Sequence, residues 1–339
     1  MALNLSNKYR PKEFSDVSSQ KSIIKILERQ VETREFKNCY LFSGPSGTGK
    51  TTIARIFANK INRGLGEPFE IDAASNNSVD NVRTIIESAT QRSLDSEYKI
   101  YIIDECHMIT PQGWNAFLKC IEEPPKYTMF MFCTTDPQKL PPTIINRCQV
   151  YNLSRIPLDN IIKRLDYICE QEGIAYETEA INFIAKIANG SMRQAIAYLD
   201  KCKDYSSKFI SVRSVLEALG DYSYDTMFNL TNAIMDNNKE QIINIIEGLY
   251  NNGNDLKLFI DSYLDFILDL AKYCIFNSLT VIKIPATMKR NLDYTTGIEN
   301  KEQFFNEFID KVLKIKQAIK GDSNIKTTIE IMLLNMGKI

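Results

Sequence analysis

The chain has 339 residues, a length that predicts two or three domains with a hydrophobic core in each. Charged residues make up 24% of the sequence and the net charge is −1, so the composition excludes a strongly acidic or basic protein but is compatible with a local DNA-binding surface. No segment approaches the roughly 18 apolar residues of a membrane span, and residues 1–14 lack the apolar centre of a secretion signal, which predicts a cytoplasmic protein without a membrane partner.

The first segment, residues 7–20, is basic and is expected to be extended. A helix is predicted to follow it over Gln20–Glu32, with Ser18 or Ser19 as the capping residue. From its residues alone, this segment is equally compatible with an arm packed on the core and with a functional role.

Residues 40–52, with the sequence YLFSGPSGTGKTT, contain the pattern G-x-x-x-x-G-K-[ST]. The apolar run at 39–42 predicts a buried strand before this pattern. Apolar residues at helical spacing predict a helix after it, over Lys50–Lys60. A strand, a glycine-rich loop and a helix in this order are typical of a phosphate-binding loop.

The loop residues suit this chemistry individually. Gly44, Gly47 and Gly49 allow positive φ angles, which bring backbone N–H groups against phosphate oxygens. The helix N-terminus adds a partial positive charge. Lys50 is then expected on the β- and γ-phosphates, and Thr51 is expected on Mg²⁺.

A short strand is predicted at Phe69–Ile71 and a helix over Val79–Arg92, and the apolar run Lys99–Ile103 indicates a central parallel strand. This strand ends in Asp104 and Glu105. A carboxylate at the carboxyl end of a strand beside the phosphate loop suits Mg²⁺, and the next carboxylate suits polarisation of an attacking water. The alternative is two acidic residues that simply follow a strand.

Another buried strand is predicted at Met129–Cys133. Thr135, just beyond its end, is a candidate contact for the γ-phosphate or the attacking water, with a turn cap as the alternative. A last strand is predicted at Gln149–Leu153. This alternation predicts an α/β fold with a doubly wound parallel sheet and a ligand at the carboxyl ends of its strands.

No strand is expected beyond Pro157. Arg193 lies in the first turn of a predicted helix, where the helix dipole does not favour a cation. It therefore suggests an anionic ligand, with a surface salt bridge as the alternative. The apolar helix Phe259–Phe276 carries aspartates at four-residue intervals, which predict a solvated face. Their positions are Asp261, Asp265 and Asp269.

These patterns predict a nucleotide-binding domain at 1–156, a small helical bundle at 157–220 and a helical domain for assembly or packing at 221–339. The eight cysteines include no C-x-x-C pair, and His107 is the only histidine. Zinc sites require clustered cysteine and histidine, so no zinc is expected. Isolated cysteines on apolar segments are expected to be buried in a reducing compartment. They are Cys39, Cys133, Cys169 and Cys274.

The motifs, taken in order, resemble those of the bacterial DNA polymerase III tau/gamma clamp-loader subunit family, which are AAA+ ATPases. The resemblance is strong over residues 7 to about 220 and only architectural beyond. It is carried by Lys8-Tyr9-Arg10-Pro11, Phe14-Ser15-Asp16-Val17 with Gln20, GPSGTGKTT at 44–52, Ile71-Asp72-Ala73-Ala74-Ser75, IIDECHM at 102–108, EEPP at 122–125, TTDPQKLP at 134–141, Asn146-Arg147-Cys148 and Gly190-Ser191-Met192-Arg193.

The resemblance implies an AAA+ domain, a helical lid and a collar-like oligomerisation domain for the three predicted regions. It implies ATP and Mg²⁺ as cofactors, with Glu105 as the catalytic base, Thr135 as the first sensor and Arg193 as the second sensor in the lid. Arg147 is then an arginine finger that acts on the ATP of a neighbouring subunit. The residues expected at the nucleotide are Tyr9, Arg10, Pro11, Val17, Gly44, Pro45, Ser46, Gly47, Thr48, Gly49, Lys50, Thr51, Thr52 and Arg193, with Thr51 and Asp104 at Mg²⁺ and Lys50 also catalytic.

The implied function is that of an ATPase subunit that opens a sliding clamp and places it on primer–template DNA during replication. The implied partners are the clamp, the DNA, and other loader subunits or further copies in a pentameric ring. DNA phosphates are expected at four residues, without base reading, namely Asn77, Ser78, Arg83 and Lys119. Alternatives are another AAA+ DNA motor of the branch-migration helicase type and a non-hydrolysing scaffold subunit of the loader.

The sequence departs from the family pattern at several positions. Asn62–Pro68 replaces the four-cysteine zinc module, Asn146 replaces the usual serine before the finger, and Gln194 replaces the usual aspartate after the sensor arginine. The long tail by which the tau form binds polymerase and helicase is not expected after the collar-like helices. Together with the Asn-, Ile- and Lys-rich composition, the missing module suggests a bacteriophage-encoded version.

Overall fold

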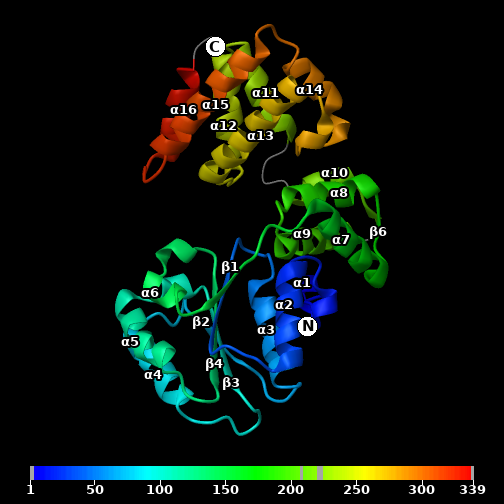
Figure 1. Ribbon diagram of the computed structural model, residues 1–339. Helices are drawn as coiled ribbons and strands as arrows, with labels where there is room; N and C mark the ends of the chain where they lie inside the picture. Colours follow the sequence, from blue (N-terminus) through cyan, green and yellow to red (C-terminus); the bar gives the residue numbers. More distant parts are fainter. Residues whose placement is uncertain (1–3, 207–208, 220–223, 337–339) are drawn as a thin grey trace. The chain divides into compact units, whose positions relative to one another are not determined.

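A computed structural model describes residues 4–206, 209–219 and 224–336 (Figure 1). The chain divides into two compact units. The first comprises residues 1–174 and 184–200, and the second comprises residues 175–183 and 201–339. The division into three domains expected from the sequence stays a prediction, and its boundary between residues 220 and 221 lies outside the described residues.

The first unit is built on a five-stranded parallel sheet, which confirms the predicted α/β class. The strand order is β2-β3-β4-β1-β5. The strand beside β1 is therefore β4, and β3, which ends in Asp104, lies one strand further from β1. The carboxyl ends of the parallel strands still meet at one edge. The strands are β1 (Cys39–Ser43), β2 (Phe69–Asp72), β3 (Lys99–Asp104), β4 (Thr128–Thr134) and β5 (Gln149–Asn152).

Helices cover both faces of this sheet, which explains the continuous apolar runs of its central strands. Because side chains alternate along a strand, Tyr40 and Phe42 pack toward one face, whereas Cys39 and Leu41 pack toward the other. The first face carries α2 (Lys21–Thr33) and α3 (Lys50–Ile61), and the second carries α4 (Val79–Ala89), α5 (Pro111–Glu122) and α6 (Pro142–Ile145) (Figure 1).

Shorter elements complete the first unit, and two helices cross its boundary. Those within the unit are α1 (Leu5–Lys8), η1 (Phe14–Asp16), η2 (Cys106–Met108), η3 (Pro137–Lys139) and α7 (Leu158–Glu172). The helices that run through the boundary are α8 (Thr178–Ile187) and α9 (Met192–Tyr205).

The second unit contains one feature that the sequence analysis did not expect. The two-residue strands β6 (Ala175–Tyr176) and β7 (Phe209–Ile210) pair in parallel. The expectation of no strand beyond Pro157 is therefore wrong. The remaining elements of this unit are α10 (Val212–Leu219), α11 (Tyr224–Met235), α12 (Lys239–Asn251), α13 (Leu256–Phe276), η4 (Leu279–Val281), η5 (Ala286–Met288), α14 (Lys289–Thr295), α15 (Lys301–Ala318) and α16 (Ile325–Leu334).

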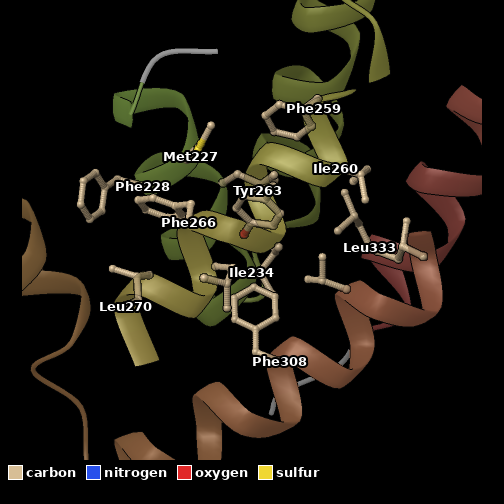
Figure 2. Close-up of a cluster of buried hydrophobic side chains, with 14 of the residues drawn as sticks. Met227, Phe228, Ile234, Phe259, Ile260, Tyr263, Phe266, Leu270, Phe308 and Leu333 are labelled. Carbon is tan, nitrogen blue, oxygen red and sulfur yellow. The ribbon is translucent and has the colours of Figure 1, made fainter. Parts of the chain in front are cut away.

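Helix α13 supplies the centre of the hydrophobic core of the second unit (Figure 2). Tyr263 is fully buried, and its ring stacks between those of Phe259 and Phe266 and meets Phe308 edge-on. Its hydroxyl lies 2.9 Å from Thr231 Oγ1, so the one polar atom of this ring is hydrogen-bonded.

The aspartates of α13 differ from the expectation of a shared solvated face. Asp261 and Asp265 are exposed. Asp269 is only 3% exposed, and its carboxylate accepts from the backbone N–H of Lys283 at 2.5 Å and lies 3.3 Å from Lys272 Nζ. Four-residue spacing drifts around a helix of 3.6 residues per turn, so the third aspartate turns inward.

The expected buried cysteines are confirmed, since all four of them lie in apolar surroundings. No helix within the described ranges is long and apolar enough to cross a membrane.

Candidate functional site

The phosphate-binding loop connects β1 to α3, and its glycines are required by both conformation and space. Gly44 and Gly47 have φ angles of 145° and 73°. A Cβ at Gly44 would lie 2.3 Å from the carbonyl oxygen of Leu153, and one at Gly47 would lie 2.0 Å from Ser191 Oγ. Met192 N–H also donates to the carbonyl of Gly47 at 3.0 Å. The loop is therefore packed directly against the start of α9.

Lys50, the first residue of α3, is a buried cation without an anionic hydrogen-bond partner. It is 5% exposed, and Nζ donates to the carbonyl oxygens of Gly44 at 2.9 Å and Pro45 at 3.1 Å. Burial lowers the pKa of Lys50, while the negative charge of Glu105 acts in the opposite direction. Neutral carbonyls do not offset the cost of burying a charge, so an anion such as a phosphate fits beside Nζ.

Thr51 and Asp104 come together although they lie on α3 and β3. Thr51 Oγ1 donates to Asp104 Oδ2 at 2.7 Å, and Asp104 Oδ1 accepts from the backbone N–H of Glu105 at 3.0 Å. Mg²⁺ is usually held by one or two carboxylates together with phosphate oxygens and water, and this pair of oxygens fits that arrangement. In the described part of the chain, no group of three or more His, Cys, Asp or Glu residues is arranged to hold a metal ion.

Glu105 follows with a backbone φ of 46°, an uncommon conformation for a residue with a side chain and one that clusters at functional sites. Its Oε2 accepts from Thr135 Oγ1 at 3.0 Å and lies 3.4 Å from His107 Nδ1. Thr135 is not among the residues that line the cavity described below. It reaches the site through Glu105, from the end of β4.

These groups open into a cavity of about 300 Å³. The predicted residues that line it are Tyr9, Arg10, Pro11, Val17, Ser46, Gly47, Thr48, Gly49, Lys50, Thr51, Thr52, Asp104, Glu105 and Arg193. Gly44 and Pro45 do not line it, and act instead through the carbonyl groups that accept from Lys50. Lining residues that the sequence analysis missed are Asn4, Ser6, Asn7, Ser18, Ser19, Ile156, Arg164, Met192 and Ile196.

Helix α7 fixes the N-terminal wall of the cavity. Arg164 donates to the carbonyl of Tyr9 at 2.7 Å, and the Tyr9 hydroxyl donates to Glu172 Oε1 at 2.6 Å. Burial, followed by the bond to Glu172, raises the pKa of Tyr9 to about 12. The sequence pointed to Tyr9 through its motif, but no local signal identified Arg164.

Positive charge is concentrated at this cavity. Burial lowers the pKa of Arg10, and the nearby guanidinium groups of Arg55 and Arg193 lower it further. Glu70 offsets part of this charge through an ion pair with Arg55. With Lys50 included, the cavity wall fits a ligand that carries several negative charges.

Arg147 is not among the residues that line this cavity. Its guanidinium donates to Glu122 Oε1 at 2.5 Å and to the carbonyl of Thr143 at 2.8 Å, at the surface beside α5 and α6. The structure therefore places Arg147 apart from this cavity.

The residues predicted to contact DNA lie just before α4, on α4 and on α5. The carbonyl of Asn77 accepts from Thr110 N–H at 3.2 Å, which joins the segments before α4 and α5. Ser78 caps α4, and the exposed Arg83 lies one turn further along that helix. Lys119 lies in the last turn of α5, roughly 12 Å from the start of that helix at 1.5 Å per residue. Lys119 therefore lies away from the start of α5, where Thr110 bonds to Asn77.

Three family models match successive parts of the chain. A model described as DNA polymerase III, delta subunit, matches residues 69–157. One described as the DNA polymerase III clamp loader subunit, ATPase lid domain, matches residues 160–202. One described as DNA polymerase III subunits gamma and tau domain III matches residues 210–338.

Curated proteins of one kind are similar to the chain. DNA polymerase III subunit tau of Bacillus subtilis is 31% identical over 97% of this chain and 62% of its own length. The tau subunit of Escherichia coli is 33% identical over 71% of this chain and 41% of its own length. The gamma subunit of Buchnera aphidicola subsp. Schizaphis graminum is 28% identical over 97% of this chain and 96% of its own length. The chain thus spans less than two thirds of the two tau proteins.

Among solved structures, the RuvB Holliday junction branch migration motor of Thermotoga maritima is similar in fold. The TM-score is 0.54 at 19% identity, over 67% of this chain and 79% of that chain. This likeness concerns the fold alone.

Proposed function

Because the chain belongs to the DNA polymerase III tau/gamma family, we propose that it is an ATP-hydrolysing subunit of a clamp loader. In this proposal it uses ATP to open a sliding clamp and place it on primer–template DNA during replication. The observation that carries the proposal is the cavity in which Lys50, the Thr51–Asp104 pair and Glu105 converge.

Each residue has a distinct task in this proposal. The loop N–H groups and Lys50 bind the phosphates, and the buried Lys50 gains an anionic partner in place of two neutral carbonyls. Thr51 and Asp104 hold Mg²⁺, which supplies neutralisation of the phosphate charge. Glu105 orients a water and takes its proton on Oε1, because Oε2 accepts from Thr135.

The surroundings of the cavity support a nucleotide rather than a simple phosphate. Apolar side chains of Val17, Ile156 and Ile196 line it together with the Tyr9–Pro11 segment, and Arg193 and Arg10 add positive charge. We infer that a purine base packs against the apolar wall while Arg193 binds phosphate. The position of Arg147, which does not line this cavity, supports a role for it on the ATP of a neighbouring subunit.

The partners follow from the same proposal. Assembly with other loader subunits or with copies of the same chain, in a ring of five, would bring Arg147 to a second site. DNA phosphates would contact Asn77, Ser78 and Arg83 at the start of α4, and Lys119 on α5. Such contacts make affinity fall steeply with salt and leave it independent of sequence.

Two substitutions test the mechanism. Glu105→Gln keeps the size of the side chain but removes the base, so ATP should bind and phosphate release should fall by about 10²–10⁴. Arg147→Ala should bind ATP almost normally and lose about 10³–10⁵ of the hydrolysis that is stimulated by clamp and primer–template, the range seen for arginine fingers. The measurements are steady-state phosphate release and equilibrium ATP binding.

Either variant also provides a clear contradiction. If Glu105→Gln releases phosphate at the wild-type rate, the assignment of the base is wrong. If Arg147→Ala keeps full stimulated turnover, Arg147 has no role in trans. Stimulation by duplex DNA alone, without a clamp, would favour a branch-migration type of motor instead.

A further inference from the structure

His107, the only histidine of the chain, lies directly beside Glu105. Glu105 is the N-cap of the η2 turn, and the N–H of Met108 donates to the carbonyl of Glu105 at 2.9 Å, which turns the chain back on itself. The His107 side chain is only 12% exposed. Its Nδ1 faces two oxygens, Thr134 Oγ1 at 3.1 Å and Glu105 Oε2 at 3.4 Å.

The hydrogen bonds of Thr134 determine which of these contacts forms. Thr134 is fully buried, and its Oγ1 already accepts from the backbone N–H of Asp136 at 3.0 Å. A hydroxyl has a single proton to donate, and a buried donor left unpaired is costly. The geometry points to the nitrogen of His107 at 3.1 Å as the acceptor for this proton, which assigns the imidazole to the Nε2–H tautomer.

This tautomer matters for Glu105. A protonated Nδ1 would donate to Glu105 Oε2 and would add a second bond to the oxygen that already accepts from Thr135. The separation of 3.4 Å is longer than an ordinary N–H···O bond. With Nδ1 committed to Thr134, the imidazole lies against the carboxylate without neutralising it.

We propose that His107 is a positioning residue for Glu105. Thr134 fixes the imidazole in the Nε2–H tautomer, whose Nδ1 offers Oε2 no hydrogen bond, so Oε2 stays bonded to Thr135 while Oε1 stays free to take a proton. This proposal rests on the proposed ATPase function, but its hydrogen-bond arrangement is observable without nucleotide.

Because the chain has one histidine, its ring nitrogens give a single pair of signals in a long-range ¹H–¹⁵N spectrum of the full chain. The wild type is expected to show an unprotonated Nδ1 and a protonated Nε2. Thr134→Val removes the hydroxyl proton and is expected to shift the Nδ1 signal toward the protonated position. Thr134→Ser, the matched control, keeps the hydroxyl and should retain the wild-type spectrum.

Kinetics provide the second readout. His107→Ala is expected to lower kcat for ATP by about 10- to 100-fold, a part of the 10²–10⁴ that a positioned base contributes, while the Kd for ATP stays within about twofold. His107→Asn places an amide oxygen where Nδ1 lies, so it accepts from Thr134 and should recover most of the loss. A purely structural role would instead change Kd and kcat together and would not distinguish the two variants.

Failure of the His107 proposal and failure of the ATPase proposal give different experimental results. A protonated Nδ1 in the wild type, an unchanged spectrum in Thr134→Val, or full kcat in His107→Ala would overturn the role of His107. A wild type that binds ATP but releases no phosphate with clamp and DNA would overturn the ATPase proposal, and the spectrum would still decide the His107 tautomer.

Discussion

One buried site in each compact unit shows how differently buried polar groups can be paired. In the second unit, Tyr263 and Thr231 satisfy each other, and the buried Asp269 accepts from a backbone N–H and lies beside Lys272. In the first unit, Lys50 is buried against neutral carbonyls, and Arg10 is crowded by other guanidinium groups.

This difference indicates which region of the protein binds a ligand. Burial of a charge is unfavourable unless a partner offsets it, and the core of the second unit pairs these groups internally. The first unit leaves positive charge unbalanced at the carboxyl edge of its sheet. Substitutions in the second unit should therefore change stability, and substitutions in the cavity should change ligand affinity.

The largest effect is expected from Phe308→Ala in the core of the second unit. Phe308 is fully buried and meets the Tyr263 ring edge-on (Figure 2). Removing it should lower the free energy of unfolding by about 3–5 kcal/mol, the cost of the cavity left behind. Urea unfolding followed by circular dichroism measures this loss, and ATP affinity should not change.

A control lies on α16. Ile331 is 54% exposed, so Ile331→Ala should change the free energy of unfolding by no more than about 0.5 kcal/mol. If Phe308→Ala lowered the free energy of unfolding as little as Ile331→Ala, the core around Tyr263 would not be what stabilises the second unit.

The next largest effect is expected from Lys50→Ala, which should change ligand affinity and leave stability nearly unchanged. Removing two charge-assisted hydrogen bonds to phosphate, worth about 1.5 kcal/mol each, should weaken ATP binding on the order of 100-fold. Without nucleotide, the free energy of unfolding should stay within about 1 kcal/mol of wild type. The substitution loses two hydrogen bonds to neutral carbonyls, but it also removes the unfavourable burial of a charge. Calorimetric titration and urea unfolding measure the two quantities.

Lys60→Ala is the matched control, since Lys60 lies on the same helix and pairs with Glu13 at the far end. Its ATP affinity should equal that of wild type. Equal weakening by both substitutions would show that general charge, and not the position of Nζ, governs binding.

The smallest effect is expected from Tyr263→Phe. The ring packing remains and only the hydroxyl bond to Thr231 is lost, which costs about 1 kcal/mol. Thr231 Oγ1 keeps its bond to the carbonyl of Met227 at 2.9 Å, so no buried donor is left unpaired. A loss above about 3 kcal/mol in urea unfolding would mean that the polar pair holds the core together.

The parts that the sequence predicted are those encoded locally. The phosphate loop with its strand and helix, the acidic pair at the end of β3 and the buried cysteines each depend on patterns within about ten residues. The structure places these elements as expected. The resemblance to the family added the N-terminal segment, whose composition alone left its role open.

The parts that the sequence did not predict depend on distant contacts. Nothing in the individual strands indicated that β4 lies between β1 and β3. The pairing of β6 with β7 involves two residues on each strand, too few for an alternating pattern. Arg164 reaches the carbonyl of Tyr9 across 155 positions of the chain. The partner of Arg147, Glu122, was likewise identified only in the structure.

The central claim is that Lys50 and the Thr51–Asp104 pair hold the phosphates and the metal ion of a nucleotide. A crystal structure with a non-hydrolysable ATP analogue and Mn²⁺, located by its anomalous signal, tests it most directly. The account predicts that Lys50 Nζ leaves the carbonyls of Gly44 and Pro45 for the phosphates, with Mn²⁺ beside Thr51 Oγ1. An analogue bound elsewhere, or a Lys50 that keeps both carbonyls with the analogue present, would contradict it.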